Sequence, residues 1–267
     1  MADTPLTFAT EDQVAVVTIN RPDRGNSLNP EMIVALEQAW ARAEADPDIR
    51  VVIITGAGDR HFCTGAAVEK LEMGQGTLVN LPNPVANRFS PRMAQFSKPV
   101  ICAVNGLVNG GGLHFIADSD IVIAHEGVVF MDTHVSVGQV SALESVGIVR
   151  RAGIGAALLM GLAGKAYRMP AARAWQIGMI DMLEPDAPAV MARARELAQA
   201  MCANSPQAMA LTKRAIWGAT EFPDPQAANV GWELLKSHWA HPDFEEGPKA
   251  FGEKRAPHWN PDPNARR

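Results

Sequence analysis

The sequence has few cysteines, no excess of basic residues and no recognisable targeting segment. Its 3 cysteines, Cys63, Cys102 and Cys202, lie far apart without the close spacing of metal ligands, so we expect reduced thiols rather than disulfides. A formal net charge of −5 gives no general attraction for nucleic acid. The stretch MADTPLTFATEDQ lacks the basic and apolar segments of a secretory signal, and no apolar run reaches the ~20 residues that span a membrane. These absences predict a cytoplasmic protein whose partners include neither nucleic acid nor membrane.

The composition that remains is typical of a globular protein with a sizeable core. Hydrophobic residues make up 47% of the chain and charged residues 20%, and 267 residues fit one large domain or a core with an appendage. Runs rich in β-branched residues predict buried strands at 14–20, 50–56 and 98–106. Between the first two runs, Asn29 followed by Pro30 is a typical helix start. The first half therefore has an α/β pattern.

The second half, from about residue 141, is predicted to be mostly helical. Apolar stripes at helical spacing run through 187–203, 205–218 and 223–240, and the last two segments carry Trp217, Trp232 and Trp239. Such helices pack either on their own core or on a partner subunit, and periodicity alone leaves both open. The stretch 73–85 has neither helical nor strand periodicity and is expected to be a loop.

Two glycine-containing loops each follow a predicted buried strand. One is GAGDRHFCTGAAVEKL at 56–71, and the other is NGGGLHFIAD at 109–118, where an apolar helix begins. Backbone N–H groups at such turns can hold developing negative charge, and two facing donors form an oxyanion hole. The alternative is a pair of ordinary strand-to-helix turns, with His114 as a buried, hydrogen-bonded histidine.

The order of these segments resembles the crotonase family, the enoyl-CoA hydratase/isomerase superfamily. The resemblance runs from about residue 13 to 259 and is carried by INRPDRGNSLNPEMIVAL, the two glycine loops and FEEGPKAFGEKRAPHW. It implies an α/β fold, a crotonase-like spiral of ββα units, with a core at 1–200 and a C-terminal helical trimerisation region at 201–267. It also implies an acyl-CoA thioester substrate, no separate cofactor because coenzyme A is part of the substrate, and a homotrimer or dimer of trimers.

Site residues can be assigned by their position in the family's motifs. The two amides expected to bind the thioester oxygen are those of Ala66 and Gly111. The residues expected to contact the substrate or its CoA portion are Arg24, Asn26, Gly65, Ala67, Val68, Gly110, Phe251 and Lys254. Arg24 matches a position near the CoA phosphates, and the last two match a segment that closes over the nucleotide, in some cases that of a neighbouring subunit. The alternative for each charged residue is a solvated surface position.

The sequence departs from the family pattern where the chemistry takes place. Typical hydratases have glutamates at the positions of His114 and His134, and those carboxylates activate the water. Here the segment SALESVGIV stands where the family usually has PGAGGTQRL, and it brings in Glu144 as a further catalytic candidate. Ala67 replaces a common aspartate. Imidazole, with an ordinary pKa near ~6.5, can act as acid or base, so we predict that the two histidines form the acid–base pair. Alternatively, they fill space in a site that has lost its activity.

Neighbouring side chains extend this prediction. Asp118 follows His114 by one helical turn and Asp132 lies near His134, so either carboxylate can orient a ring, whereas Asp120 is expected to be structural. No third ligand has convincing spacing for a metal.

The sequence therefore predicts an enoyl-CoA hydratase-like lyase that forms a thioester enolate, placed in fatty acid or other lipid metabolism. One alternative is hydrolysis of a C–C bond in a β-dicarbonyl substrate. The other is a homologue that binds acyl-CoA without catalysis.

Overall fold

The computed structural model describes residues 4–67 and 88–266, which form two β-sheets flanked by helices. In these residues the larger sheet has six strands in the order β1-β2-β3-β5-β7-β10. Their bounds are β1 (Leu6–Glu11), β2 (Val14–Ile19), β3 (Val51–Gly56), β5 (Val100–Val104), β7 (Ile121–His125) and β10 (Met182–Glu184). β1 pairs with β2 in antiparallel fashion, and every other pairing in this sheet is parallel. The three strands predicted at 14–20, 50–56 and 98–106 are thereby confirmed, whereas Val68 and the predicted loop at 73–85 lie outside the described residues.

Strand β3 explains why the core has two halves, one on each face of the sheet. All six of its residues are buried, and successive side chains point to opposite faces. Ile53 packs with residues of α5 (Ala187–Cys202) on one face. Ile54 packs on the other face with α1 (Pro30–Ala45) and α2 (Leu113–Asp118). The two parallel-sheet faces are therefore both covered, as near-continuous apolar strands require.

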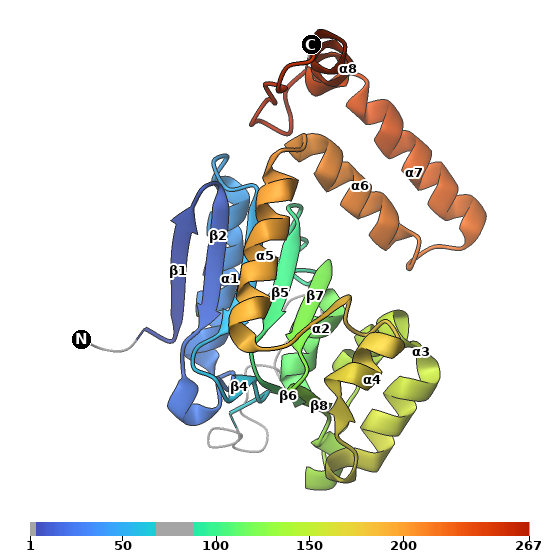
Figure 1. The fold of residues 1–267 in the computed structure, drawn as a ribbon. Coiled ribbons are helices and arrows are strands. Elements are labelled where there is room, and N and C mark those ends of the chain that lie inside the picture. The colour runs from blue at the N-terminus through green and yellow to red at the C-terminus, as the bar shows by residue number, and fades with distance from the viewer. Residues whose placement is uncertain (1–3, 68–87, 267) are drawn as a thin grey trace.

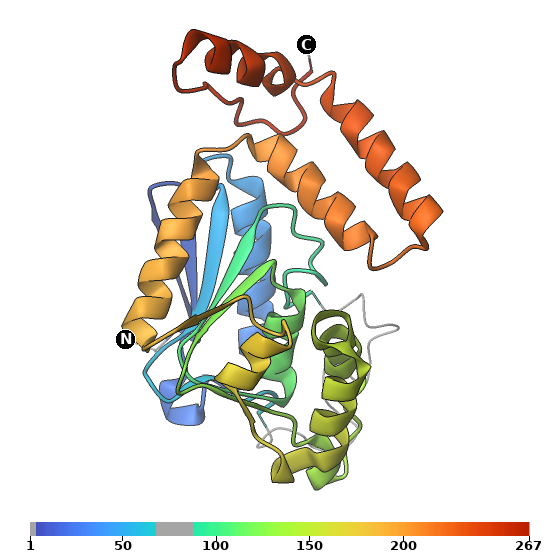
Figure 2. The same cartoon turned by 45° about the vertical axis from the view of Figure 1, so that its right-hand side comes forward.

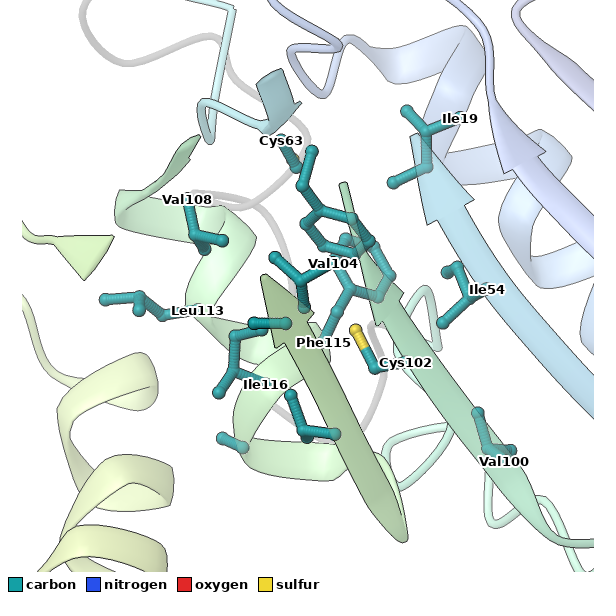
Figure 3. Close-up of a cluster of buried hydrophobic side chains, with 14 of the residues drawn as sticks. Ile19, Ile54, Cys63, Val100, Cys102, Val104, Val108, Leu113, Phe115 and Ile116 are labelled. Atoms are coloured by element: carbon teal, nitrogen blue, oxygen red, sulfur yellow. The ribbon is translucent and has the colours of Figure 1, made fainter. Parts of the chain in front are cut away.

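The half of the core that contains Ile54 packs against α2. Figure 3 shows Ile54, Cys102 and Phe115 among the side chains that fill the space between the sheet and α2. The phenyl ring of Phe115 also meets that of Phe62 edge-on, with ring centroids 5.9 Å apart. All three cysteines are free and buried, as expected for reduced thiols, and burial raises the pKa of Cys63 to about 12.

The smaller sheet consists of short strands that follow the long ones. In the described residues its order is β4-β6-β8-β9. The bounds are β4 (His61–Cys63), β6 (Leu107–Asn109), β8 (Val129–Met131) and β9 (Met169–Pro170). β4, β6 and β8 run parallel to one another, and β9 is antiparallel to β8. Because β4 and β6 are neighbours, the two glycine loops that follow them emerge side by side.

Helix α1 begins where the sequence predicts. The side-chain oxygen of Asn29 accepts a hydrogen bond from the Met32 amide at 2.9 Å, and Pro30 occupies the first turn. The Trp40 ring is buried, and its Nε1 donates to the Phe89 carbonyl at 2.7 Å. This bond ties α1 to the segment that precedes β5.

Helix α3 (Leu143–Ala163) is long, apolar and broken in the middle. Gly153 has a φ of 79°, which interrupts the helix. By length and composition alone, Leu143–Ala166 is apolar enough to cross a membrane, which departs from the expectation that no segment reaches this length. Arg151 lies within it and donates to the carbonyls of Ser119 and Asp120, which joins α3 to the sheet.

The remaining elements link the sheets to the C-terminal end. They are the 3₁₀ turns η1 (Pro22–Arg24), η4 (Gly110–Gly112), η5 (His134–Val137) and η6 (Gly164–Ala166), and the helices α4 (Ala171–Gln176), α6 (Pro206–Gly218), α7 (Asp224–His238) and α8 (Asp243–Glu253). Helices α5, α6 and α7 match the three predicted helical segments. In both views α7 and α8 extend beyond the end of the larger sheet (Figures 1 and 2). The domain division at residue 200 stays a prediction.

Candidate active site

The two glycine loops approach each other closely enough for their backbones to touch. A Cβ on Gly65 would lie only 2.7 Å from the Gly111 amide nitrogen, and Gly65 has a φ of +86°, which favours glycine. A Cβ on Gly111 would lie 3.6 Å from the Ala66 nitrogen. The predicted pair of amides, from Ala66 and Gly111, is therefore brought to one place by the tertiary structure.

The backbone around Ala66 also directs its amide. Leu28 forms a parallel bridge with Ala66, donating to the Gly65 carbonyl at 2.8 Å and accepting from the Ala67 amide at 2.9 Å. Because backbone groups alternate in direction along an extended strand, the N–H of Ala66 points away from Leu28. The Gly111 backbone lies against Gly65 and Ala66, so the amides of Ala66 and Gly111 come close together.

His114 is the second residue of α2 and is almost completely buried. Its side chain is 6% exposed, and its ring meets the Phe89 ring edge-on with centroids 5.1 Å apart. Its Nε2 lies 3.3 Å from Oε1 of Glu144 on α3. Asp118, which the sequence offered as a partner for this ring, instead accepts a hydrogen bond from Ser90 Oγ.

His134 lies at the start of η5, beside the second glycine loop. A Cβ on Gly110 would be 3.3 Å from Cε1 of His134, so this ring sits directly beside the loop. Its Nδ1 donates to Oδ1 of Asp132 at 2.7 Å, which leaves Nε2 facing Glu144 Oε1 at 3.8 Å. Asp132 is held in turn by the Ser141 hydroxyl. The orienting role expected of Asp132 thus fits its position, and Ser141 is a partner that the sequence analysis missed.

Glu144 Oε1 lies between the two imidazole rings. Burial opposes ionisation of Glu144, but the contact with His114 and the charges of both histidines outweigh it, and the pKa of Glu144 is lowered. The hydrogen bond to Asp132 raises the pKa of His134 against the effect of partial burial. Both shifts therefore favour the charged forms, a Glu144 carboxylate facing a His134 imidazolium.

The comparison with known families is decisive for the identity of the fold. The model of the family Enoyl-CoA hydratase/isomerase matches residues 9–262. The chain belongs to this family.

Relatives match over nearly the full length of the enoyl-CoA hydratase/isomerase chain. It is 34% identical to the (E)-benzylidenesuccinyl-CoA hydratase of Thauera aromatica, over 95% of this chain and 98% of that protein. It is 30% identical to the short-chain-enoyl-CoA hydratase of Clostridium acetobutylicum, over 92% of this chain and 93% of that protein. A solved enoyl-CoA hydratase/isomerase from Mycobacterium paratuberculosis has a TM-score of 0.86 at 34% identity, over 97% and 98% of the two chains. The chain is thus an enzyme of this family with the α/β crotonase fold.

The residues predicted to contact the CoA portion of the family's acyl-CoA substrates fall into two groups. Arg24 is exposed on η1, near the first glycine loop. Asn26 is completely buried, and its amide donates to the carbonyls of Ala57 and His61, so its side chain holds this loop together. Phe251 is 88% exposed on α8 and Lys254 follows that helix, at the end of the chain remote from β4 and β6 (Figure 1). These last two residues meet an active site only if it belongs to a neighbouring subunit.

Proposed function

We propose that this enzyme adds water to an enoyl-CoA thioester, with Glu144 as base, His134 as acid and His114 positioning Glu144. The single observation that carries the proposal is the placement of Glu144 Oε1 at 3.3 Å from His114 Nε2 and 3.8 Å from His134 Nε2. All three groups lie beside the loop that carries Gly111. This proposal gives the base role to Glu144 rather than to His114, because its lowered pKa keeps it ionised.

The proposed step balances without any further reactant. Glu144 takes a proton from water as the water oxygen bonds to the β-carbon, and the electrons move to the thioester oxygen. The amides of Ala66 and Gly111 stabilise the resulting enolate, a contribution worth roughly 10²–10³-fold per donor in related geometries. His134 Nε2 then gives its proton to the α-carbon. Transfer of the proton from Glu144 to His134 restores both groups.

Two further observations support hydration. The Thauera relative is named a hydratase of a thioester, and the Clostridium relative is named a short-chain-enoyl-CoA hydratase. The edge-on contact of the buried Phe89 ring also holds the His114 imidazole beside Glu144, the proposed base toward water.

The test is a panel of CoA thioesters with product masses as the readout. Incubation with crotonyl-CoA and longer enoyl-CoAs is expected to add the mass of one water. His134→Ala and Glu144→Gln should each lower kcat by about 10²–10⁴-fold, the usual worth of positioned acid–base groups, and His114→Ala should lower kcat less because it removes only a positioning group. Glu126→Gln, at an exposed turn outside the site, is the matched control and should leave kcat unchanged. Unchanged kcat in all three site variants would falsify the proposed roles.

One observation favours a second reaction class. An Asp–His pair such as Asp132–His134, with Nδ1 and Oδ1 2.7 Å apart, is also suited to activating water against a ketone. That arrangement would hydrolyse a C–C bond of a β-dicarbonyl thioester. In the same panel this reaction gives two shorter acids or thioesters instead of one hydrated product.

We also propose that the active form is a homotrimer or a dimer of trimers in the cytoplasm. The support is a set of large apolar side chains that one chain leaves exposed on α3, α6 and α7. They include Leu162 at 73%, Ile216 at 65% and Trp232 at 52% exposure. Contact with other subunits would bury them and present α8 to a neighbouring site.

A further inference from the structure

A cavity of about 360 Å³ opens beside His114. It lies between α2, α3, the segment around Arg92 and the turn after α6. Met93, Leu143 and Val146 give it an apolar wall. His114 lines this cavity and also belongs to the proposed reaction site, so the cavity borders that site.

Two arginines, Arg92 and Arg150, line this cavity. The Arg92 guanidinium stacks 4.5 Å from the centre of the Trp217 ring, and its Nη2 bonds to Glu221 at 2.7 Å. Its Nη1 is buried and has no hydrogen-bond partner among residues 4–67 and 88–266. Burial, together with the neighbouring charge of Arg150, lowers the pKa of Arg92. A guanidinium nitrogen in this condition has unused capacity to donate to an anion.

Arg150 is the second cation, on the exposed side of α3. Within the described part of the chain it forms no ion pair. Two acids face the same cavity: Glu221, which is already bonded to Arg92, and Asp118, which is bonded to Ser90. Burial raises the pKa of Asp118, and the hydrogen bond from Ser90 and the charges of His114, Arg92 and Arg150 oppose that rise. The combination is an apolar wall that ends at two cations with donors to spare.

We propose that this cavity selects acyl-CoA thioesters whose acyl group carries a second carboxylate at its far end, bound by Arg92 and Arg150. The inference rests on the proposed function in one respect, namely that the thioester carbonyl lies between Ala66 and Gly111. The apolar wall then contacts the methylene segment, and the arginines bind the terminal carboxylate through charge-assisted hydrogen bonds.

The test compares two saturated thioesters that differ only at the chain end, adipyl-CoA and hexanoyl-CoA. Neither has a double bond to hydrate, so calorimetry measures binding independently of the reaction. Adipyl-CoA is expected to bind about 10- to 100-fold more tightly, the range for hydrogen bonds to charged groups. Arg150→Gln should weaken adipyl-CoA binding about tenfold and leave hexanoyl-CoA binding unchanged. The preference should also fall with added salt, because Arg150 is exposed.

Two further variants complete the design. Arg195→Gln, which removes an exposed arginine paired with Glu11 on β1, is the matched control and should change neither affinity. Glu221→Gln frees Arg92 from its carboxylate partner and should strengthen adipyl-CoA binding, a readout that does not depend on removing the packed Arg92 side chain. Equal affinities for the two thioesters, or equal weakening of both by Arg150→Gln, overturn the inference.

The outcome for the proposed function is separate. Hydration of enoyl-CoAs without a preference for adipyl-CoA contradicts only the inference about the cavity. A preference for adipyl-CoA without hydration of any enoyl-CoA contradicts only the proposed reaction.

Discussion

At the scale of single residues, the protonation states around Glu144 determine what the site can do. Glu144 faces two imidazole nitrogens, and its pKa is lowered although burial alone would raise it. His134 differs from His114 in having a second carboxylate partner besides Glu144, namely Asp132, whose Oδ1 lies 2.7 Å from its Nδ1. The two histidines are therefore not equivalent. We assign the proton-donating role to His134, because its hydrogen bond to Asp132 stabilises the positive charge of its ring.

Replacing Asp132 by Asn should change the pH dependence of the reaction. Asp132 is the main cause of the raised pKa of His134. If His134 acts as an imidazolium acid, kcat/KM falls as pH rises through that raised pKa. Asp132→Asn should therefore move the high-pH limb of the profile to lower pH, with the low-pH limb, set by Glu144, much less affected. The measurement is kcat/KM for crotonyl-CoA from pH 3 to pH 9, a range that brackets the ordinary carboxyl and imidazole pKa values of about 4 and 6.5.

Asp181→Asn, whose carboxylate pairs with Arg151 elsewhere in the fold, is a suitable comparison. It should leave both limbs in place. An Asp132→Asn enzyme that is slower at every pH, with no displacement of the high-pH limb, would show that Asp132 has only a structural role.

At the scale of elements, the site depends on short strands that end together. β4 and β6 are parallel neighbours, and each leads into a glycine loop. The loops pack so closely that a Cβ on Gly65 would lie only 2.7 Å from the Gly111 nitrogen. Helix α3 then supplies Glu144 from its first turn. Three separate elements therefore contribute the groups of the proposed site.

Gly111→Pro tests whether the second glycine loop supplies an oxyanion donor. Proline has no N–H, so one of the two proposed donors is lost, and kcat should fall by roughly 10²–10³-fold. Gly111→Ala is the matched control because it keeps the N–H. Its Cβ would lie 3.3 Å from Cα of Gly65, a tight contact that requires only a small shift, so its kcat should fall much less. Circular dichroism and thermal melting establish that both variants are folded, and a folded Gly111→Pro enzyme with near-normal kcat would exclude this donor.

At the scale of the whole molecule, the chain leaves large apolar faces uncovered. α3 exposes Ile154, Leu158 and Leu162, and α7 exposes Trp232 and Leu235. Leu143–Ala166 is long and apolar enough to qualify as a membrane-spanning helix. The same apolar composition also suits contact between subunits. In the single chain, Figures 1 and 2 show α7 lying along the outside of the molecule.

Light scattering of the wild-type protein at micromolar concentration should give the mass of a trimer or hexamer. Leu235→Glu places a charge on the exposed side of α7, where Leu235 is 49% exposed, and should shift the mass toward the monomer. Val34→Glu makes the same change on α1, at a side chain of similar exposure, and should not. A wild-type protein that stays monomeric contradicts the proposed assembly, and with it any role for Phe251 and Lys254 in a neighbouring site.

The elements that could be predicted from the sequence are those specified by local patterns. The strand at 50–56 is a run of β-branched residues, and the helix after Asn29 has its cap and its proline in adjacent positions, so each is encoded within a few residues. The order of the glycine loops indicated the family, and the family match confirmed it. The break at Gly153 was missed because an isolated glycine inside an apolar run gives no indication of its φ.

The sequence by itself thus determined the strands, the helices and the two glycine loops, and it supplied the candidate side chains for the site. Only the tertiary structure decided which of those side chains meet. Asp118 and Asp132 were equally plausible partners for a histidine by spacing, yet burial beside Ser90 gave Asp118 a different partner, while a turn brought Asp132 onto His134. The position of Glu144 between the two rings depends on how α3 packs on α2, through Gly147 against Ala117. Such distances arise from packing between elements remote in the chain, which no local pattern encodes.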